Sequence, residues 1–186
     1  MPSQKKKTLL PTFEILFENK YVIRGELYPG LAPNTVGAFI HLANSGFYDG
    51  AVTIDGNKNA LLQIDHLEKK APFCVDGEMP LNDCTYNTGK LSYGGLCMFH
   101  PNGCYSTRSH FMIVLQNTPR SINMLSADYT FFGQALEGLQ FARLLSCYCW
   151  DKYNQRPIYH KIQSIRVDTH GVEYPFQTVP VPDRYP

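Results

Sequence analysis

Short runs in which apolar and polar residues alternate recur along the chain, a pattern typical of half-buried β-strands. The first two runs, residues 13–18 and 21–27, are separated only by Asn19 and Lys20, which predicts a β-hairpin. A closing strand is predicted over residues 158–168, where the alternation is longest. Further strand-like runs are expected at 51–54, 60–64, 96–99, 111–115 and 129–135.

Two segments have the periodicity of short amphipathic helices. The first, residues 32–46, has Pro33 in its first turn and Gly46 at its end, positions that these residues favour. The second covers residues 138–147. Because His41 is off the apolar stripe of the first helix, we expect it to face solvent. The predicted buried faces are Val36, Phe39, Ile40 and Ala43 in the first helix and Phe141, Leu144 and Leu145 in the second.

Many short strands with only two short helices favour a mainly β fold, a closed antiparallel barrel whose open ends are covered by the helices. Residues 65–94 are polar and rich in glycine, and we expect a loop there with one short strand. A length of 186 residues suits one domain. We assign it to residues 12–176, between a basic tail at 1–11 and a proline-rich tail at 177–186.

Composition excludes several classes of protein. The chain is 44% hydrophobic and 18% charged, as in ordinary soluble domains, which argues against collagen, coiled coil and disorder. No apolar run approaches the roughly 18–20 residues that span a bilayer, so no membrane partner is expected. A net charge of +1 gives no general attraction to nucleic acid. We expect a monomer.

The N-terminus carries a run of three lysines, Lys5 to Lys7, followed by Leu9, Leu10 and Pro11. A signal peptide would continue with a longer apolar stretch, so we expect a cytoplasmic protein. The run is interpreted as a solvated tail, with a weak anchor for acidic partners as the alternative.

Cysteines of a cytoplasmic protein are expected to be thiols. None of the six forms a C-x-x-C pair, and we predict buried or half-buried thiols and no cofactor; a zinc site or a regulatory disulfide is the alternative. A metal site would draw on Cys97, His100, Cys104 and His110, whose spacing fits zinc poorly. The six cysteines of the chain are Cys74, Cys84, Cys97, Cys104, Cys147 and Cys149.

Several motifs, in collinear order over about residues 13–176, resemble bacterial single-domain cyclophilins. They are Gly25-Glu26-Leu27-Tyr28-Pro29, Ala32-Pro33-Asn34-Thr35-Val36, Gly46-Phe47-Tyr48-Asp49-Gly50, Gly77-Glu78, Gly95-Leu96-Cys97-Met98, Ser109-His110-Phe111-Met112-Ile113, Phe132-Gly133-Gln134-Ala135-Leu136-Glu137-Gly138 and the segment 162–175. The resemblance implies an eight-stranded barrel with two helices, and a peptidyl-prolyl cis-trans isomerase that acts in protein folding, with proline-containing segments as its partners.

The same resemblance implies an altered active site. Counted without gaps from Tyr48-Asp49-Gly50, the position of the family's catalytic arginine carries Asp55, and only the glutamine is retained, as Gln63. The pocket aromatic falls on Ala60 and the pocket methionine on Leu61.

The second half of the implied site is altered too. The family's glutamine is replaced by His110, and the phenylalanine that lines the proline pocket by Met112, next to Phe111. The family's Ala-Asn pair appears as Phe99-His100. Further wall positions fall on Met124, Leu125 and Tyr129.

Isomerisation must break amide resonance, which makes the uncatalysed rotation slow. A cationic donor near the prolyl nitrogen helps in the twisted state, and an aspartate offers acceptors only. By analogy with other transition-state donors, its loss costs about 2.7–4 kcal/mol, a factor of about 10²–10³.

Two residues are candidate substitutes for the missing donor. Arg108 borders the same groove, and it either supplies a displaced donor, pairs with Asp55, or is a solvated surface residue. His110 would donate when protonated, with activity rising below roughly pH 6.5, or else it is a buried, hydrogen-bonded histidine.

The methionines leave a further choice open. Met112 and Met124 either make an adaptable pocket or fill core volume left by Ala60. Two functions follow: a weakly active isomerase, or an inactive cyclophilin-like module that binds proline-containing or extended peptides.

Overall fold

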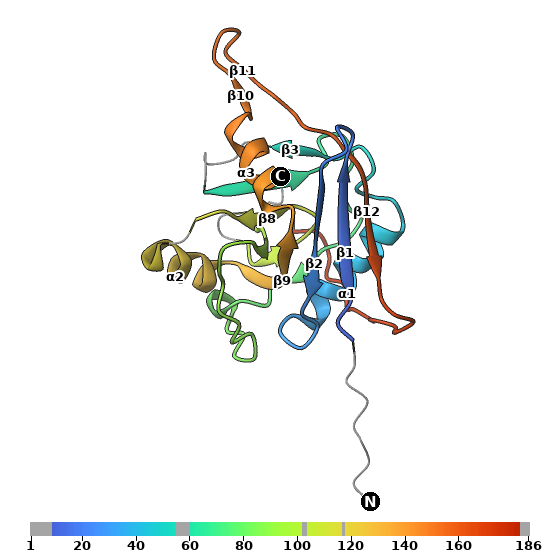
Figure 1. Cartoon of the computed structure of the whole chain (residues 1–186). Coiled ribbons are helices and arrows are strands. Elements are labelled where there is room, and N and C mark those ends of the chain that lie inside the picture. The colour runs from blue at the N-terminus through green and yellow to red at the C-terminus, as the bar shows by residue number, and fades with distance from the viewer. Residues whose placement is uncertain (1–8, 55–59, 102–103, 117, 183–186) are drawn as a thin grey trace, which may run out of the picture.

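The computed structural model describes residues 9–54, 60–101, 104–116 and 118–182. Its elements follow the chain as short strands interrupted by three α-helices and one 3₁₀ turn (Figure 1). They are β1 (Thr12–Phe17), β2 (Val22–Leu27), α1 (Pro33–Asn44), β3 (Val52–Ile54), β4 (Leu61–Asp65), β5 (Val75–Asp76), η1 (Pro80–Asn82), β6 (Gly95–Met98), β7 (Ser106–Thr107), β8 (Phe111–Val114), α2 (Pro119–Asp128), β9 (Thr130–Glu137), α3 (Leu139–Cys147), β10 (Trp150–Asp151), β11 (Arg156–Pro157) and β12 (Ile162–Asp168).

Eight strands form one antiparallel sheet in the order β12-β1-β2-β9-β6-β8-β4-β3. Its two ends meet, because Val52 at the start of β3 bridges to Lys161 just before β12. Hydrogen bonds from the Gly50 N–H to the Ile162 carbonyl and from the Thr53 N–H to the His160 carbonyl continue this closure. The sheet is therefore a nearly closed barrel, as the strand pattern predicted.

Alternation along the strands directs one set of side chains into the barrel. Phe13, Ile15 and Phe17 of β1 are buried there, opposite residues of β12 that are buried in the same core. Phe39 of α1 packs edge-on against Phe111 of β8, so the helix covers one end of this core. The predicted hairpin, first helix and last helix are confirmed.

The prediction of two helices was wrong, since α2 is a third. Its sequence is mostly polar and none of its residues is fully buried, so no broad apolar stripe marked it. The signal that was present is local: Pro119 stands at its first turn, directly after Thr118 at the N-cap position.

The predicted strand over 158–168 is shorter than expected, because β12 begins only at Ile162. Residues 158–161 connect β12 to a small hairpin, β10–β11, that projects from the barrel beyond α3 (Figure 1). It carries the single tryptophan, Trp150, and the fully exposed Tyr153.

Among the described residues no helix has the length and apolarity to cross a bilayer.

The last described residues, 172–182, lie along α1 instead of leaving the domain. The Asn34 side chain donates to the Gln177 carbonyl and accepts from the Gln177 N–H. Val179 forms an antiparallel bridge with Cys74. The proline-rich segment predicted as a tail from 177 is therefore held to the domain at least as far as Val179.

All six cysteines are within the described residues, and none of them forms a disulfide there. Three of them, Cys74, Cys97 and Cys104, are buried. Cys147 and Cys149 lie at the end of α3 and just after it, so their spacing does not reflect a strand.

Candidate functional site

The strand register brings a second set of side chains together on the outside of the barrel. Met112 of β8 pairs with Gln63 of β4 on one side and Cys97 of β6 on the other, and Cys97 pairs with Phe131 of β9. Because facing residues in an antiparallel sheet share a face, these four form a row across four strands. Phe111, one residue before Met112, points the opposite way, into the barrel core.

This row is the centre of an apolar group that we call the outer cluster. Helix α2 packs against it through Ile122 and Leu125, and the loop after β2 contributes two more residues. The outer cluster consists of Leu91, Cys97, Met112, Val114 and Phe131, all buried, with Tyr28, Leu31, Leu61, Phe99, Ile122, Leu125 and Tyr129 partly buried around them.

Polar groups lie at the β4 side of the outer cluster. His110 Nε2 is 2.9 Å from Gln63 Oε1. Phe99 stacks on the His110 imidazole, with the ring centroids 4.3 Å apart. Phe99 is also nearly parallel to the ring of Tyr129, at 6.2 Å, so its side chain lies between the two.

His110 is neutral near physiological pH. Burial lowers its pKa to about 4, while Asp65 acts to raise that pKa and Lys70 to lower it. The expected gain of a proton below about pH 6.5 does not match this pKa. Its alternative, a histidine held by hydrogen bonding, agrees with the contact to Gln63.

His100 fixes the far edge of the outer cluster. Its Nε2 is 2.6 Å from the Asp128 carbonyl oxygen and its Nδ1 is 3.1 Å from that of Pro101. The ring also packs against Tyr129, 5.3 Å between centroids. Burial and the neighbouring Asp128 raise the pKa of Tyr129. His100 thus connects the loop after β6 to the end of α2.

Only some of the predicted site residues lie in the outer cluster. Leu61, Phe99, Met112, Leu125 and Tyr129 gather in the outer cluster, with Gln63 and His110 at its edge. Phe111 was assigned to the pocket, and this was wrong, because its side chain fills the barrel core.

Met124 and Ala60 are not members of the outer cluster. Met124 is 59% exposed, because it lies on the solvent side of α2, and Ile122 packs inward in its stead. Ala60 precedes β4, where its carbonyl accepts the Leu115 N–H. Asp55 lies outside the described residues.

Arg108 is held within the fold. Its Nε donates to the carbonyl of Ala71, and the side chain is half-buried. A fully solvated surface arginine, one of the three expectations, does not describe it. Its predicted pairing with Asp55 falls outside the described residues.

Sequence reasoning missed several members of the outer cluster, among them Cys97, Val114 and Ile122. Alternation within 111–115 could have shown that Met112 and Val114 share a face. The spacing of Ile122 and Leu125, three residues apart before Tyr129, was the corresponding signal in α2.

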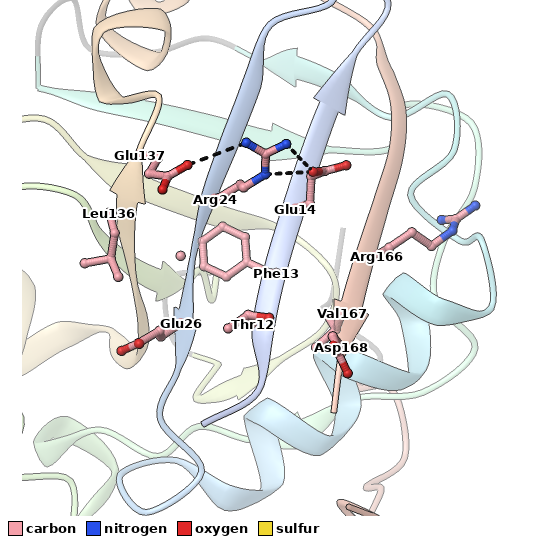
Figure 2. Close-up of a pocket in the computed structure, with 11 residues that line it drawn as sticks. Thr12, Phe13, Glu14, Arg24, Glu26, Leu136, Glu137, Arg166, Val167 and Asp168 are labelled. Carbon is pink, nitrogen blue, oxygen red and sulfur yellow. Dashed lines mark hydrogen bonds and ion pairs between the residues drawn. The ribbon is translucent and has the colours of Figure 1, made fainter. Parts of the chain in front are cut away.

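A different cavity, of about 560 Å³, lies over β12, β1, β2 and β9 (Figure 2). Its charges are largely matched: Arg24 lies between Glu14 and Glu137, at 2.8 and 3.5 Å. It shares no residue with the outer cluster. Within the described residues, no group of three or more His, Cys, Asp or Glu is placed to hold a metal ion.

Chemically, the outer cluster offers an apolar surface with one neutral donor and acceptor pair at its edge. Such a surface suits a proline ring, whose nitrogen carries no hydrogen, flanked by peptide groups that hydrogen-bond. Glutamine and neutral histidine can each donate one hydrogen bond and accept another.

Comparisons with known proteins agree with the barrel fold. Residues 13–167 match the family model described as cyclophilin type peptidyl-prolyl cis-trans isomerase/CLD. The chain is 33% identical over 141 residues to peptidyl-prolyl cis-trans isomerase B of Bacillus subtilis (strain 168), which covers 74% of this chain and 92% of that protein.

Solved structures show the same fold at lower identity. A Cryptosporidium parvum cyclophilin type isomerase matches with a TM-score of 0.70 at 18% identity, over 86% of this chain and 98% of that one. Its structure in the presence of the dipeptide Ala-Pro gives 0.68 at 20% identity, over 84% and 98%. A Mimivirus cyclophilin gives 0.62 at 15% identity, over 89% and 92%.

A family match over most of the chain, together with the bacterial relative, identifies the class. The chain belongs to the cyclophilin-type peptidyl-prolyl cis-trans isomerase family.

Proposed function

We propose that this protein isomerises X–Pro bonds in proline-containing segments, at the outer cluster and with a low turnover. The proposal rests on where the predicted pocket residues lie in the fold. Five residues that the family resemblance assigns to the substrate pocket come together in one apolar group, with Gln63 and His110 at its edge. Residues from β4, β6, β8 and α2 supply this group, and its partly buried members are the proposed contacts for the peptide.

The low turnover follows from the residue at position 55. An aspartate there supplies no donor to the prolyl nitrogen, so the twisted state loses stabilisation of about 2.7–4 kcal/mol. The apolar surface and the Gln63–His110 pair still bind and orient the peptide, which preserves part of the catalysis. The proposed setting is the cytoplasm, with the protein as a monomer.

A second function is supported by Phe99. The family places an alanine at this position, whereas the ring of Phe99 lies between His110 and Tyr129. It therefore occupies space beside the Gln63–His110 pair. A groove narrowed in this way favours a module that binds extended or proline-containing peptides without turning them over.

Magnetisation-exchange NMR on a peptide containing Ala-Pro separates the two functions. Cis–trans exchange faster than the uncatalysed rate is expected with the wild-type protein. Leu125→Ala should lower kcat/KM by about tenfold, because truncating an apolar wall removes on the order of 1–2 kcal/mol of binding. Leu136→Ala, at an exposed leucine of β9 outside the outer cluster, should leave it unchanged.

Peptide shifts in the outer cluster without catalysed exchange would support the binding module and contradict the isomerase. Absence of both exchange and shifts would overturn both proposals.

A further inference from the structure

A cavity of about 410 Å³ lies away from the outer cluster, where the start of β3, the loop after β4 and the chain entering β12 meet. None of its lining residues belongs to the outer cluster. Gly50, Val52 and Leu67 form part of its wall, and Tyr159 stands at its side, 45% exposed. Its volume is large enough for a small organic molecule or the end of a peptide.

The chemistry of this cavity centres on His66, which is only 7% exposed and follows the last residue of β4. The backbone N–H groups of Glu68 and Lys69 both donate to its Nδ1, at 3.3 and 3.1 Å. A ring nitrogen that accepts hydrogen bonds carries no proton, so in the neutral ring the proton is on Nε2.

The Nε2–H group of His66 faces the cavity. A Cβ atom at Gly50, which lines the same cavity, would lie 3.8 Å from Nε2, so the absence of a side chain at Gly50 leaves this side of the ring open. No acceptor for Nε2 is present among the described residues. His66 Nε2 is not one of the fully buried polar atoms without a partner, so its N–H is accessible from the cavity and can donate to a group that enters there.

Four charged side chains of the described residues line the cavity. Lys69 and Lys161 both line it, and neither forms an ion pair within the described part of the chain. Two carboxylates are also present. Asp49 is engaged by both terminal nitrogens of Arg166, at 2.8 and 2.9 Å, whereas Glu68 is exposed at the rim.

We propose that this cavity is an oxyanion site, in which a phosphate or carboxylate group accepts a hydrogen bond from His66 Nε2–H and is attracted by Lys69 and Lys161. The three donors come from two segments that close the barrel, so the site is built by the fold. The apolar wall formed by Val52 and Leu67 would contact the organic part of a larger ligand. The site is independent of isomerase activity.

The test is a titration of the ¹⁵N-labelled full chain at neutral pH with sodium phosphate and, separately, with sodium acetate, each against sodium chloride at equal ionic strength. Saturable shifts are expected for the Gly50 and Leu67 amides and the His66 imidazole nitrogens with an oxyanion, and none with chloride. Saturation by phosphate alone or by acetate alone identifies the group that the site takes.

The decisive variant is His66→Asn. The Asn side-chain oxygen can still accept from the Glu68 and Lys69 N–H groups, but the donor at the Nε2 position is lost. Affinity should fall about tenfold, in line with the loss of a charge-assisted hydrogen bond. The matched control is His170→Asn, an exposed histidine at φ 52° that asparagine tolerates.

Lys69→Gln combined with Lys161→Gln tests the site through surface positions that the fold does not need, with Lys152→Gln as its control. The proposal is overturned if the shifts do not saturate, if chloride produces them equally, or if His66→Asn and the double lysine variant both bind as the wild type does.

Discussion

The ring of Phe99 lies against the imidazole of His110, with centroids 4.3 Å apart and planes inclined by 29°. Phe99 directly follows β6 and His110 directly precedes β8, so the contact joins the ends of two neighbouring strands at the edge of the outer cluster. Tyr129 continues the same row on the other side of Phe99. Aromatic stacking of this kind fixes ring positions, and here it fixes the shape of the candidate peptide site.

Replacing Phe99 with alanine should widen the candidate groove. We expect Phe99→Ala to bind an Ala-Pro peptide more tightly, at a cost in stability of about 1–2 kcal/mol, less than the cost in a core because the ring is only half-buried. NMR titration and urea denaturation measure the two effects. Phe73→Ala, at a half-buried ring outside the outer cluster, is the control. Weaker binding by Phe99→Ala would show that the ring contacts the peptide.

Stability should depend on pH through His110. Its pKa is lowered to about 4 by burial, whereas the unfolded chain takes up this proton near pH 6.5. The stabilisation from neutral His110 is therefore complete above pH 6.5, and it is lost as the pH falls through about 4, at up to about 1.4 kcal/mol per pH unit. Urea unfolding between these pH values should show a steeper decline for the wild type than for His110→Gln. Equal slopes would contradict the assignment.

Glu78 should be a main determinant of stability around α1. Its carboxylate is 3% exposed and accepts the N–H groups of Asn34 and Thr35 at the helix N-terminus, and the hydroxyl of Tyr86. We expect Glu78→Ala to lower the free energy of unfolding by about 2–4 kcal/mol, and Glu78→Gln by about 1–2 kcal/mol. Glu137→Gln, whose exposed carboxylate pairs with Arg24, should cost less than about 0.5 kcal/mol. A loss for Glu78→Ala no larger than that of the control would contradict this role.

The C-terminal segment should detach when its contact with α1 is disturbed. A Cβ atom at Gly37 would lie 2.7 Å from the Tyr174 carbonyl oxygen and 3.0 Å from Phe176 Cβ. Gly37→Ala is therefore expected to expose residues 172–182 to limited proteolysis. Gly30→Ala, at a position with open space around it, is the control. Cleavage at equal rates in both variants would mean that the segment is not held by this contact.

The strands, the hairpin and two of the helices could be predicted because each carries its own periodic pattern. Helix α2 could not, since only Ile122 and Leu125 pack in the outer cluster and none of its residues is fully buried. For the candidate site, motif positions identified five residues that lie together in the outer cluster. They could not show that Met112 faces the outer cluster while Phe111 faces the core, or that Ile122 packs inward while Met124 is exposed. The face on which a side chain lies depends on strand register and helix rotation.

The lowered pKa of His110 could not be predicted from the sequence either. A histidine's pKa depends on burial and on charges that are distant in the chain, such as Asp65 and Lys70. The same holds for His66, whose tautomer is fixed by two backbone N–H groups.

We propose that the outer cluster is an isomerase site whose turnover is limited mainly by the missing cationic donor. Magnetisation exchange on an Ala-Pro peptide with the wild type and Asp55→Arg tests it most directly, with Asp55→Gln as the control for removal of the negative charge. We predict slow catalysed exchange by the wild type, a gain of about 10²–10³-fold for Asp55→Arg, and a far smaller change for Asp55→Gln. No catalysed exchange by either the wild type or Asp55→Arg, with the peptide still bound at the outer cluster, would contradict the claim.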